Sequence, residues 1–216
     1  MQNLQKFYIN GQWINPQSSK KMPVVNPATE EIIGEVILGN DEDVNIAVNA
    51  AKESFKSFSK TSKEERMGIL KNIRKISEAR FDDLADAMTM EMGAPRKMSR
   101  EAQADAAIGH LDGFISALEK HEEKIQLSNT DVLLKEPIGV CGLITPWNWP
   151  INQITLKVLP VIATGCTSIL KPSEHTPLSA MVYAEILDEA GVPAGVFNLV
   201  QGDGEGVGIA MSRHPD

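Results

Sequence analysis

After about residue 138 the chain alternates apolar runs with helical patterns, and few folds are compatible with this order. Three runs rich in β-branched residues are each followed by a segment in which apolar residues recur at helical spacing. The runs span 138–145, 167–170 and 196–200, and the helical segments span 153–163, 178–189 and 206–211. Continuous apolar runs are typical of parallel strands buried on both faces. The pattern therefore predicts an α/β fold with a Rossmann-like βαβαβα parallel sheet, whose ligand lies at the carboxyl ends of the strands.

The first 122 residues follow two other patterns. Before residue 40, short stretches rich in aromatic and β-branched residues are separated by turn residues, which predicts an antiparallel strand arm. Residues 41–122 are mainly helical in spacing, with a capping box at Ser62 and Glu65 and an interruption at Gly93. We therefore expect three parts: a strand arm with a helical segment (1–122), a connecting strand segment (123–137) and the sheet (138–216).

Charge and cysteine usage narrow the classes of partner. The 216 residues include 21 basic and 29 acidic side chains, and the net charge of −8 opposes binding to nucleic acid and to acidic membranes. No signal peptide is evident, and no apolar stretch reaches the roughly 20 residues of a membrane-spanning helix. Two cysteines without a CxxC motif provide no disulfide framework, so a reducing cytoplasm fits best. The four histidines lack metal-ligand spacing, and we expect no metal site.

One amide side chain is placed at the predicted ligand-binding edge of the sheet. The segment Thr145-Pro-Trp-Asn-Trp-Pro150 follows the first parallel strand, and its prolines and indoles bracket Asn148. The amide N–H₂ of Asn148 could donate a hydrogen bond to a developing oxyanion, and loss of one such donor costs roughly 100- to 1,000-fold in rate. The alternative is an Asx-type turn in which Asn148 only satisfies the backbone.

A cation and a carboxylate follow the second parallel strand. Lys171 and Glu174 lie three residues apart, and a ribose could sit between them, with Lys171 donating and Glu174 accepting hydrogen bonds. The alternative is an exposed pair at the start of a helix, where Ser173 or Thr176 is the cap and Glu174 meets the helix dipole. From spacing alone, this alternative is favoured.

A glycine-rich turn, Gly202-Asp-Gly-Glu-Gly-Val-Gly208, follows the third parallel strand. Its N–H groups could face an anion, although Val207 stands where the third glycine of a GxGxxG motif belongs. A flexible connection is the alternative.

Three further reactive side chains lie in apolar surroundings. Lys157 could be a buried catalytic amine, but snorkelling or pairing with a carboxylate explains its position more simply. Cys141 and Cys166 are expected to be buried small hydrophobic residues rather than activated thiolates.

Taken together, four segments resemble the NAD(P)-dependent aldehyde dehydrogenase superfamily. They are ING…VNPATEEIIGEV, ITPWNWP, KPSEHTP and EAGVPAGVFNLVQGDG, in this order. The resemblance covers the whole chain and implies the N-terminal portion of that fold, ending with the first half of the dinucleotide-binding sheet. It also implies oxidation of an aldehyde to a carboxylic acid with NAD, through a thiohemiacetal on a catalytic cysteine.

The resemblance implies roles for individual residues. Asn148 matches the asparagine that holds the thiohemiacetal oxyanion, and Lys157 matches a lysine that supports the active site. Lys171 and Glu174 match residues that contact the adenosine ribose, with Ser173 in the same turn. The other expected cofactor-binding residues are Ile144, Thr145, Pro146, Trp147, Gly204 and Gly208. Because Glu174 would repel a ribose 2′-phosphate, we expect NAD as the cofactor, with NADP as the alternative.

Family members are usually more than twice as long as this chain. Their nucleophilic cysteine and general-base glutamate lie beyond the glycine-rich turn, and neither Cys141 nor Cys166 matches that nucleophile. We therefore expect a truncated chain that lacks the catalytic domain and is inactive alone. The alternatives are a non-catalytic adenosine-binding or oligomerisation module, and a coenzyme A-acylating aldehyde dehydrogenase.

Self-association is a further expectation. The resemblance implies homodimers or homotetramers built partly through a strand from the segment of about 119–137, which includes the strand segment 123–137. Three strands of an open parallel sheet would also leave an unpaired edge and an uncovered apolar face, which invite self-association.

Overall fold

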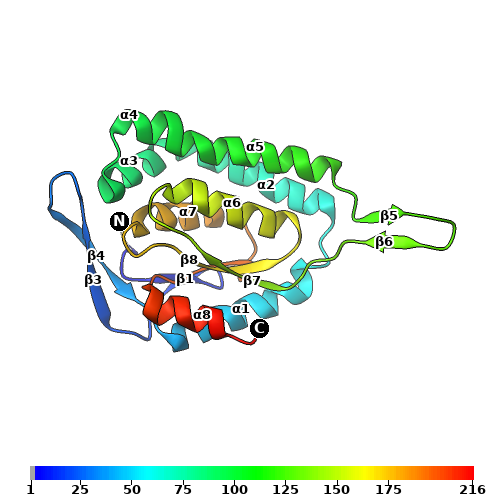
Figure 1. Ribbon diagram of the computed structural model, residues 1–216, viewed down its shortest axis with the longest axis horizontal. Helices are drawn as coiled ribbons and strands as arrows, with labels where there is room; N and C mark the ends of the chain where they lie inside the picture. Colours follow the sequence, from blue (N-terminus) through cyan, green and yellow to red (C-terminus); the bar gives the residue numbers. More distant parts are fainter. Residues whose placement is uncertain (1–2) are drawn as a thin grey trace.

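A five-stranded sheet organises the computed structural model, which describes residues 3–216 (Figure 1). The strands run in the order β2-β1-β9-β8-β7. They are β1 (Phe7–Ile9), β2 (Gln12–Ile14), β7 (Val140–Ile144), β8 (Thr167–Lys171) and β9 (Phe197–Leu199). β7, β8 and β9 are parallel, as the apolar runs predict.

Helices cover both faces of this sheet. The crossovers α6 (Pro150–Ala163) and α7 (Pro177–Glu189) lie on one face, while α1 (Asp41–Phe58) and α8 (Ile209–Arg213) lie on the other (Figure 1). A π-helical turn, η2 (Gly204–Gly208), leads into α8. The βαβαβα prediction is confirmed, because β7, β8 and β9 are parallel and are connected through α6 and α7, with η2 and α8 after β9.

The N-terminal strands correct one expectation. We expected them to form a separate arm and the parallel strands to leave an open edge. Instead, β1 pairs antiparallel with β9 through Tyr8 and Leu199, and β2 continues the sheet. Every side chain of β1 is buried, so this strand is stable only with both faces covered. The predicted unpaired edge is present at β7, the outer parallel strand within residues 3–216, and not at β9. The expected uncovered apolar face is wrong, because α1 and the segment of η2 and α8 pack on it.

A separate antiparallel pair matches the predicted arm. It consists of β3 (Lys20–Val25) and β4 (Ile32–Leu38), which pair with each other and not with the main sheet.

A helical layer packs over α6 and α7. It comprises α2 (Lys63–Ala79), α3 (Phe81–Met92), the short α4 (Arg96–Met98) and α5 (Asp105–Lys120). The predicted capping box starts α2, with Ser62 and Glu65 bonded in both directions, and Gly93 in the left-handed region ends α3. The helix expected from residue 99 begins instead with a π-helical turn, η1 (Ser99–Ala104). No helix within residues 3–216 is both long and apolar enough to cross a membrane.

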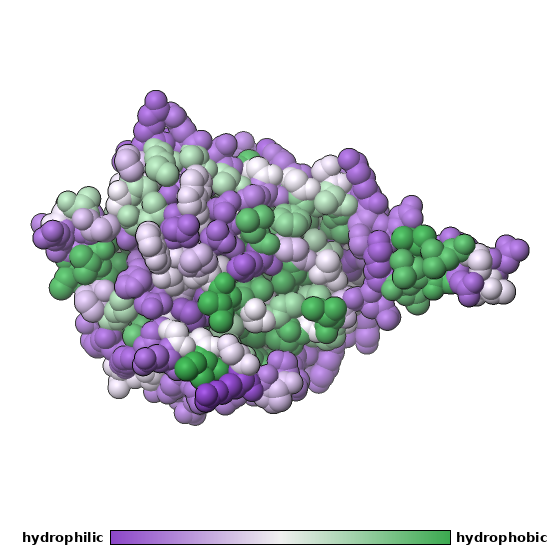
Figure 2. All heavy atoms as spheres, in the orientation of Figure 1, coloured by the Kyte–Doolittle hydropathy of each residue, from purple (hydrophilic) through white to green (hydrophobic). Residues whose placement is uncertain are grey.

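A hairpin projects from one end of the molecule (Figure 1). Its strands are β5 (Lys124–Gln126) and β6 (Val132–Leu134), where a single connecting strand was expected. It carries the exposed apolar side chains Leu127, Val132, Leu133 and Leu134, which form a hydrophobic patch on the projection (Figure 2).

Candidate functional site

The parallel strands end side by side, which gathers most of the predicted cofactor-binding residues at one edge. Ile144 of β7 is in register with Lys171 of β8, and the backbone N–H of Thr145 donates to the Lys171 carbonyl at 3.2 Å. The N–H of Val200, just after β9, donates to the Leu170 carbonyl at 3.0 Å. The three segments that leave the sheet here therefore share one edge, as a dinucleotide-binding sheet requires.

Lys171 is buried at this edge, with only 3% of its surface exposed. Its ammonium donates to the carbonyls of Pro172 and Gly202, both at 2.7 Å, and to the Glu174 carboxylate at 3.3 Å. Burial lowers the pKa of Lys171, while the carboxylates of Glu174 and Asp203 oppose that shift. The alternative of an exposed lysine is wrong, because these acceptors draw the ammonium beneath the glycine-rich turn.

The cap of α7 comes from a different part of the chain. Thr176 stands at the N-cap position of α7, but neither its hydroxyl nor that of Ser173 bonds to the first N–H groups of the helix. The Ser173 hydroxyl instead accepts a hydrogen bond from the His175 N–H at 3.3 Å. The buried carboxylate of Glu91 in α3 accepts from the backbone N–H groups of Leu178 and Ser179. The capping alternative is therefore wrong, because Glu91 already occupies the N–H groups that a local cap would bind.

The glycine-rich turn is a folded element rather than a flexible connection. Asp203 is the N-cap of η2, and its carboxylate accepts from the Gly206 N–H at 2.7 Å. A Cβ at Gly202 would lie 2.3 Å from the Val207 side chain, so the turn closes tightly on itself. Gly204, in contrast, has open space beside it.

Gly208 brings the turn against the buried lysine. A Cβ at this position would lie 3.9 Å from Cδ of Lys171. The structure thus joins Lys171, Gly202 and Gly208 in one cluster, with Glu174 at its partly exposed rim.

Thr145, directly after β7, is buried, but the three residues that follow it are exposed. Pro146, Trp147 and Asn148 are exposed, and Trp149 precedes α6, which has no side-chain cap. No hydrogen bond within residues 3–216 holds the Asn148 amide, so the structure does not show the Asx-type turn.

Lys157 and the cysteines lie away from this cluster. Lys157 is half-buried about two helical turns into α6 and pairs with no carboxylate within residues 3–216. Cys166 is buried, as expected, whereas Cys141 is only half-buried.

Lys20, Glu91 and Asp203 hold the site and were not predicted from the sequence. The Lys20 ammonium lies 2.8 Å from the Asp203 carboxylate, although the two residues are 183 positions apart. Asp203 stands three residues before the N–H that it caps, and this spacing could have revealed it. No local pattern marks Lys20 or Glu91, because both act on distant segments.

Comparison with known proteins agrees with this architecture. The model of the aldehyde dehydrogenase family matches residues 13–216. A 3-succinoylsemialdehyde-pyridine dehydrogenase from a Pseudomonas species is 48% identical over 217 residues, which cover 100% of this chain and 45% of that protein. A putative aldehyde dehydrogenase of Staphylococcus aureus is 46% identical, with the same shares covered.

Solved structures give the same result. An aldehyde dehydrogenase from Bartonella henselae matches with a TM-score of 0.96 and 47% identity over 98% of this chain and 45% of the other. A cysteine-to-alanine mutant of aldehyde dehydrogenase C from Pseudomonas syringae, in complex with NAD⁺ and octanal, matches with a TM-score of 0.97 and 46% identity, covering 99% and 44%. The chain spans less than half the length of these relatives, from their N-terminal portion. By sequence and by fold, the chain belongs to the aldehyde dehydrogenase family.

Proposed function

We propose that this chain is the N-terminal, adenosine-binding portion of an NAD-dependent enzyme that oxidises an aldehyde to a carboxylic acid. The observation that carries the proposal is the buried Lys171 ammonium, held at the carboxyl end of β8 beside Glu174 and the glycine-rich turn. The Pseudomonas syringae relative with NAD⁺ and octanal, and a betaine aldehyde dehydrogenase of Staphylococcus aureus with NAD⁺, support this choice of cofactor.

The residues present fit the adenosine side of NAD. Ribose hydroxyls both donate and accept hydrogen bonds. Of the three hydrogen bonds that the Lys171 ammonium makes, the one to Glu174 is the longest, at 3.3 Å, and it is the one that a ribose hydroxyl would replace. The open space at Gly204 and the bare Cα of Gly208 allow close backbone approach. The negative charge of Glu174 disfavours a 2′-phosphate, which favours NAD over NADP.

The remaining expected cofactor contacts extend this surface. We assign Ser173 to the ribose side, and the backbone and side chains of Ile144, Thr145, Pro146 and Trp147 to the side that follows β7. When bound, NAD accepts the hydride that leaves the substrate.

Asn148 is the proposed oxyanion donor. Its exposed amide has no intramolecular partner within residues 3–216, so it is available to a substrate-derived oxygen. That oxygen belongs to a thiohemiacetal on a cysteine beyond residue 216, since Cys166 is buried and Cys141 faces the core between strand and helix.

We assign Lys157 a supporting role in α6 rather than a direct contact with substrate. The chain alone is therefore expected to be inactive.

Calorimetric titration of the 216-residue chain with AMP and NAD tests this proposal. Binding should be detectable, and Glu174→Gln should weaken binding of both nucleotides at least ~10-fold, because a hydrogen bond to a charged group is worth about 1.5–3 kcal/mol. The same variant should bind 2′,5′-ADP more tightly than the unchanged chain, since the repelling charge is gone. Lys75→Met, an exposed lysine on α2, is the matched surface control.

Two outcomes would contradict the proposal. One is the absence of AMP and NAD binding by the unchanged chain. The other is robust NADH formation with a short aliphatic aldehyde, which would place a nucleophile within these 216 residues.

A further inference from the structure

The two cysteines are neighbours at the start of the parallel sheet. Cys141 is the second residue of β7 and is in register with Ser168 of β8, while Cys166 directly precedes β8. Side chains along a strand alternate between the two faces, so Cys166 lies on the same face as Ser168 and Cys141. Accordingly, both cysteines contact the same hydrophobic cluster, whereas Val140 packs against the cluster on the opposite face. The two sulfurs are therefore diagonal neighbours on one face of the sheet.

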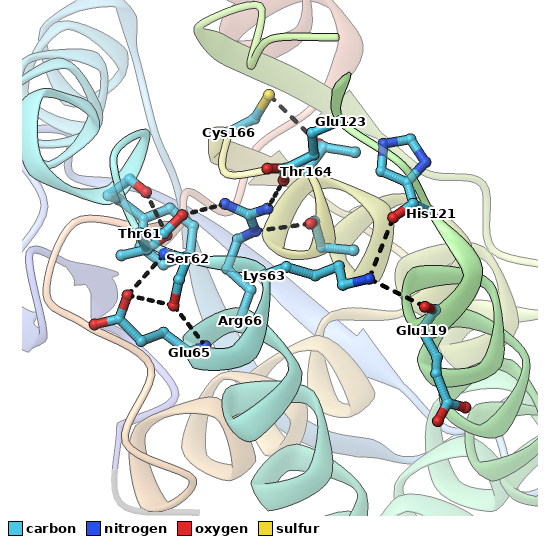
Figure 3. A network of polar contacts seen from close by, with 12 residues as sticks. Thr61, Ser62, Lys63, Glu65, Arg66, Glu119, His121, Glu123, Thr164 and Cys166 are labelled. Atoms are coloured by element: carbon cyan, nitrogen blue, oxygen red, sulfur yellow. Dashed lines mark hydrogen bonds and ion pairs between the residues drawn. The ribbon is translucent and has the colours of Figure 1, made fainter. Parts of the chain in front are cut away.

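Hydrogen-bond donors surround the Cys166 sulfur. The Thr164 hydroxyl donates to it at 3.6 Å (Figure 3). The Cys141 thiol is the donor with the largest effect, and the backbone N–H groups of Gly139 and Ile138 add two more. Together these donors lower the pKa of Cys166 to about 5, against the opposing effect of burial. At neutral pH this sulfur is therefore a thiolate, the form that reacts with oxidants, contrary to the expectation from its apolar sequence context.

Cys141 is in the complementary state. Its pKa is raised, first by the hydrogen bond that it donates to Cys166, and further by burial and by the negative charge of that sulfur. Cys141 therefore stays a protonated thiol as long as Cys166 is a thiolate. When Cys166 loses its negative charge, two of the causes that raise the pKa of Cys141 are removed, and the second thiol becomes more acidic.

A small oxidant can approach the pair from the root of the projecting hairpin. Thr164 and Pro137 line a cavity of about 470 Å³ there, and Ile138 between the hairpin and β7 is 88% exposed. Because Thr164 also bonds to the Cys166 sulfur, the cavity ends one side chain away from it. The pair lies where β7 and β8 begin, at the opposite end of the strands from Lys171.

We propose that Cys141 and Cys166 form an oxidative modification site, at which a hydroperoxide converts the two thiols into an intramolecular disulfide. The Cys166 thiolate attacks the peroxide, so an S–O bond forms while the O–O bond breaks, and the leaving hydroxide or alkoxide takes up a proton. The Cys141 thiol then displaces the hydroxyl group of this sulfenic acid, so that an S–S bond forms and water leaves. Two thiols are oxidised and one peroxide is reduced. The inference does not depend on the proposed nucleotide site.

Peptide mapping of the folded 216-residue chain after treatment with hydrogen peroxide at pH 7 tests this proposal. Trypsin cleaves after Lys157, between the two cysteines, so an intramolecular disulfide joins two tryptic peptides. We expect this cross-link as the main product, with loss of both free thiols. In urea the cross-link should form at least roughly tenfold more slowly, because the donors around Cys166 are lost and its pKa returns toward about 8.5.

Serine variants separate the roles of the two thiols. In Cys141→Ser, the serine hydroxyl keeps the hydrogen bond to Cys166, which should accumulate as a sulfenic acid that dimedone traps. In Cys166→Ser, the Cys141 thiol should react with peroxide at least roughly tenfold more slowly at pH 7, because it is not a thiolate.

A threonine pair on α6 provides the matched control. Thr164→Val removes one donor to the Cys166 sulfur and should slow sulfenic acid formation roughly threefold at pH 5.5, the change expected when the pKa rises by about one unit. Thr155 donates to the carbonyl four residues earlier at 2.9 Å, as Thr164 does at 2.8 Å, but its hydroxyl bonds to no sulfur within residues 3–216. Thr155→Val should leave the rate unchanged.

Three outcomes would overturn the proposal. The first is a folded chain that forms neither the cross-link nor a sulfenic acid at Cys166. The second is an equally fast reaction of Cys141 in Cys166→Ser, which would make Cys141 the reactive sulfur. The third is a disulfide-linked dimer on a non-reducing gel in place of the intramolecular product, which would show that the two sulfurs do not reach each other. Titration with AMP and NAD tests the nucleotide site separately.

Discussion

Glu91 shows how one buried side chain can connect two parts of the molecule. It belongs to α3 in the helical layer, yet its carboxylate accepts from the first free N–H groups of α7, next to the turn that carries Lys171 and Glu174. Burial raises the pKa of Glu91 from 4.5 to about 8, because desolvation outweighs the backbone N–H groups that favour the charged form. The folded protein therefore binds a proton at Glu91 more readily than the unfolded chain does.

We expect this residue to make stability fall as pH rises. The folded pKa is raised, so the contribution of Glu91 is fully present below pH 4.5 and is lost progressively as the pH rises to about 8. Each unit of pKa difference is worth about 1.4 kcal/mol, so the total is on the order of a few kcal/mol. Urea denaturation between pH 5 and pH 8.5 should show the unchanged chain losing stability relative to Glu91→Gln, which cannot titrate.

Glu64→Gln provides the control, because Glu64 is exposed on the first turn of α2. It should leave the pH dependence of the free energy of unfolding unchanged. Parallel stability curves for Glu91→Gln and the unchanged chain would show that the Glu91 pKa is ordinary in the folded state.

The sequence predicts the positions of some single residues in the candidate site but not the distant residues that contact them. The positions of Lys171, Glu174 and the glycines follow from their place after apolar runs, because strand ends meet at one edge of a parallel sheet. The partners Lys20 and Glu91 carry no such mark. Their roles depend on contacts between segments that are distant in the chain. The spacing of residues within one segment does not predict such contacts.

Elements were predicted best where local chemistry defines them. The capping box of α2 and the left-handed glycine that ends α3 are local signals, and both are confirmed. The pairing of β1 with β9 was missed, because the Tyr8 and Leu199 partners are nearly the whole chain apart. The π-helical start of α5 was missed as well, since a helical pattern in sequence does not distinguish α from π turns.

Arg66 joins elements that the sequence shows only separately. Its guanidinium, 3% exposed, donates to the carbonyls of Ala163 at 2.9 Å and Thr61 at 2.5 Å, and pairs with Glu123 at the root of the projecting hairpin (Figure 3). Nearby, Lys63 donates to the carbonyls of Glu119 and His121 at the end of α5. This cluster fixes the hairpin root to α2, α5 and α6.

Arg66→Met should therefore destabilise the chain by about 3 kcal/mol, because it leaves buried carbonyl groups without donors and Glu123 without its partner. Arg74→Met is the matched control on the same helix. Arg74 is 34% exposed and pairs with Asp112 and Glu78 at the surface, so its loss should cost less than about 1 kcal/mol. Urea denaturation measures the change in the free energy of unfolding for both variants. If the two changes are equal, the burial of Arg66 adds nothing to stability.

At the scale of the whole molecule, the sheet ends at β2 on one side and at β7 on the other, so the parallel strands have one covered edge and one unpaired edge within residues 3–216. β1 and β2 protect the β9 side, and within residues 3–216 nothing pairs with the outer edge of β7. The motifs of the sequence indicated the family correctly, but not which edge the N-terminal strands would cover. That choice follows from the buried side chains of β1, which need a partner strand and both helical layers.

Besides the unpaired edge of β7, the projecting β5–β6 hairpin is exposed. A two-stranded hairpin is marginally stable alone, and this one carries apolar side chains on both exposed faces. We therefore expect it to pack against another copy of the chain, in line with the homo-oligomer that the family resemblance implies.

Leu134→Asp should disrupt that association. Leu134 is 59% exposed on β6, and burial of a leucine is worth about 1.5–3 kcal/mol, counted twice in a twofold-symmetric interface. The dissociation constant of the oligomer, measured by sedimentation equilibrium, should rise at least ~100-fold. Ile32→Asp, 70% exposed on β4 in the other arm, should leave it unchanged. Both substitutions add the same charge to an exposed strand. If both raise the dissociation constant equally, the hairpin is not the interface, and self-association depends on net charge or on the β7 edge instead.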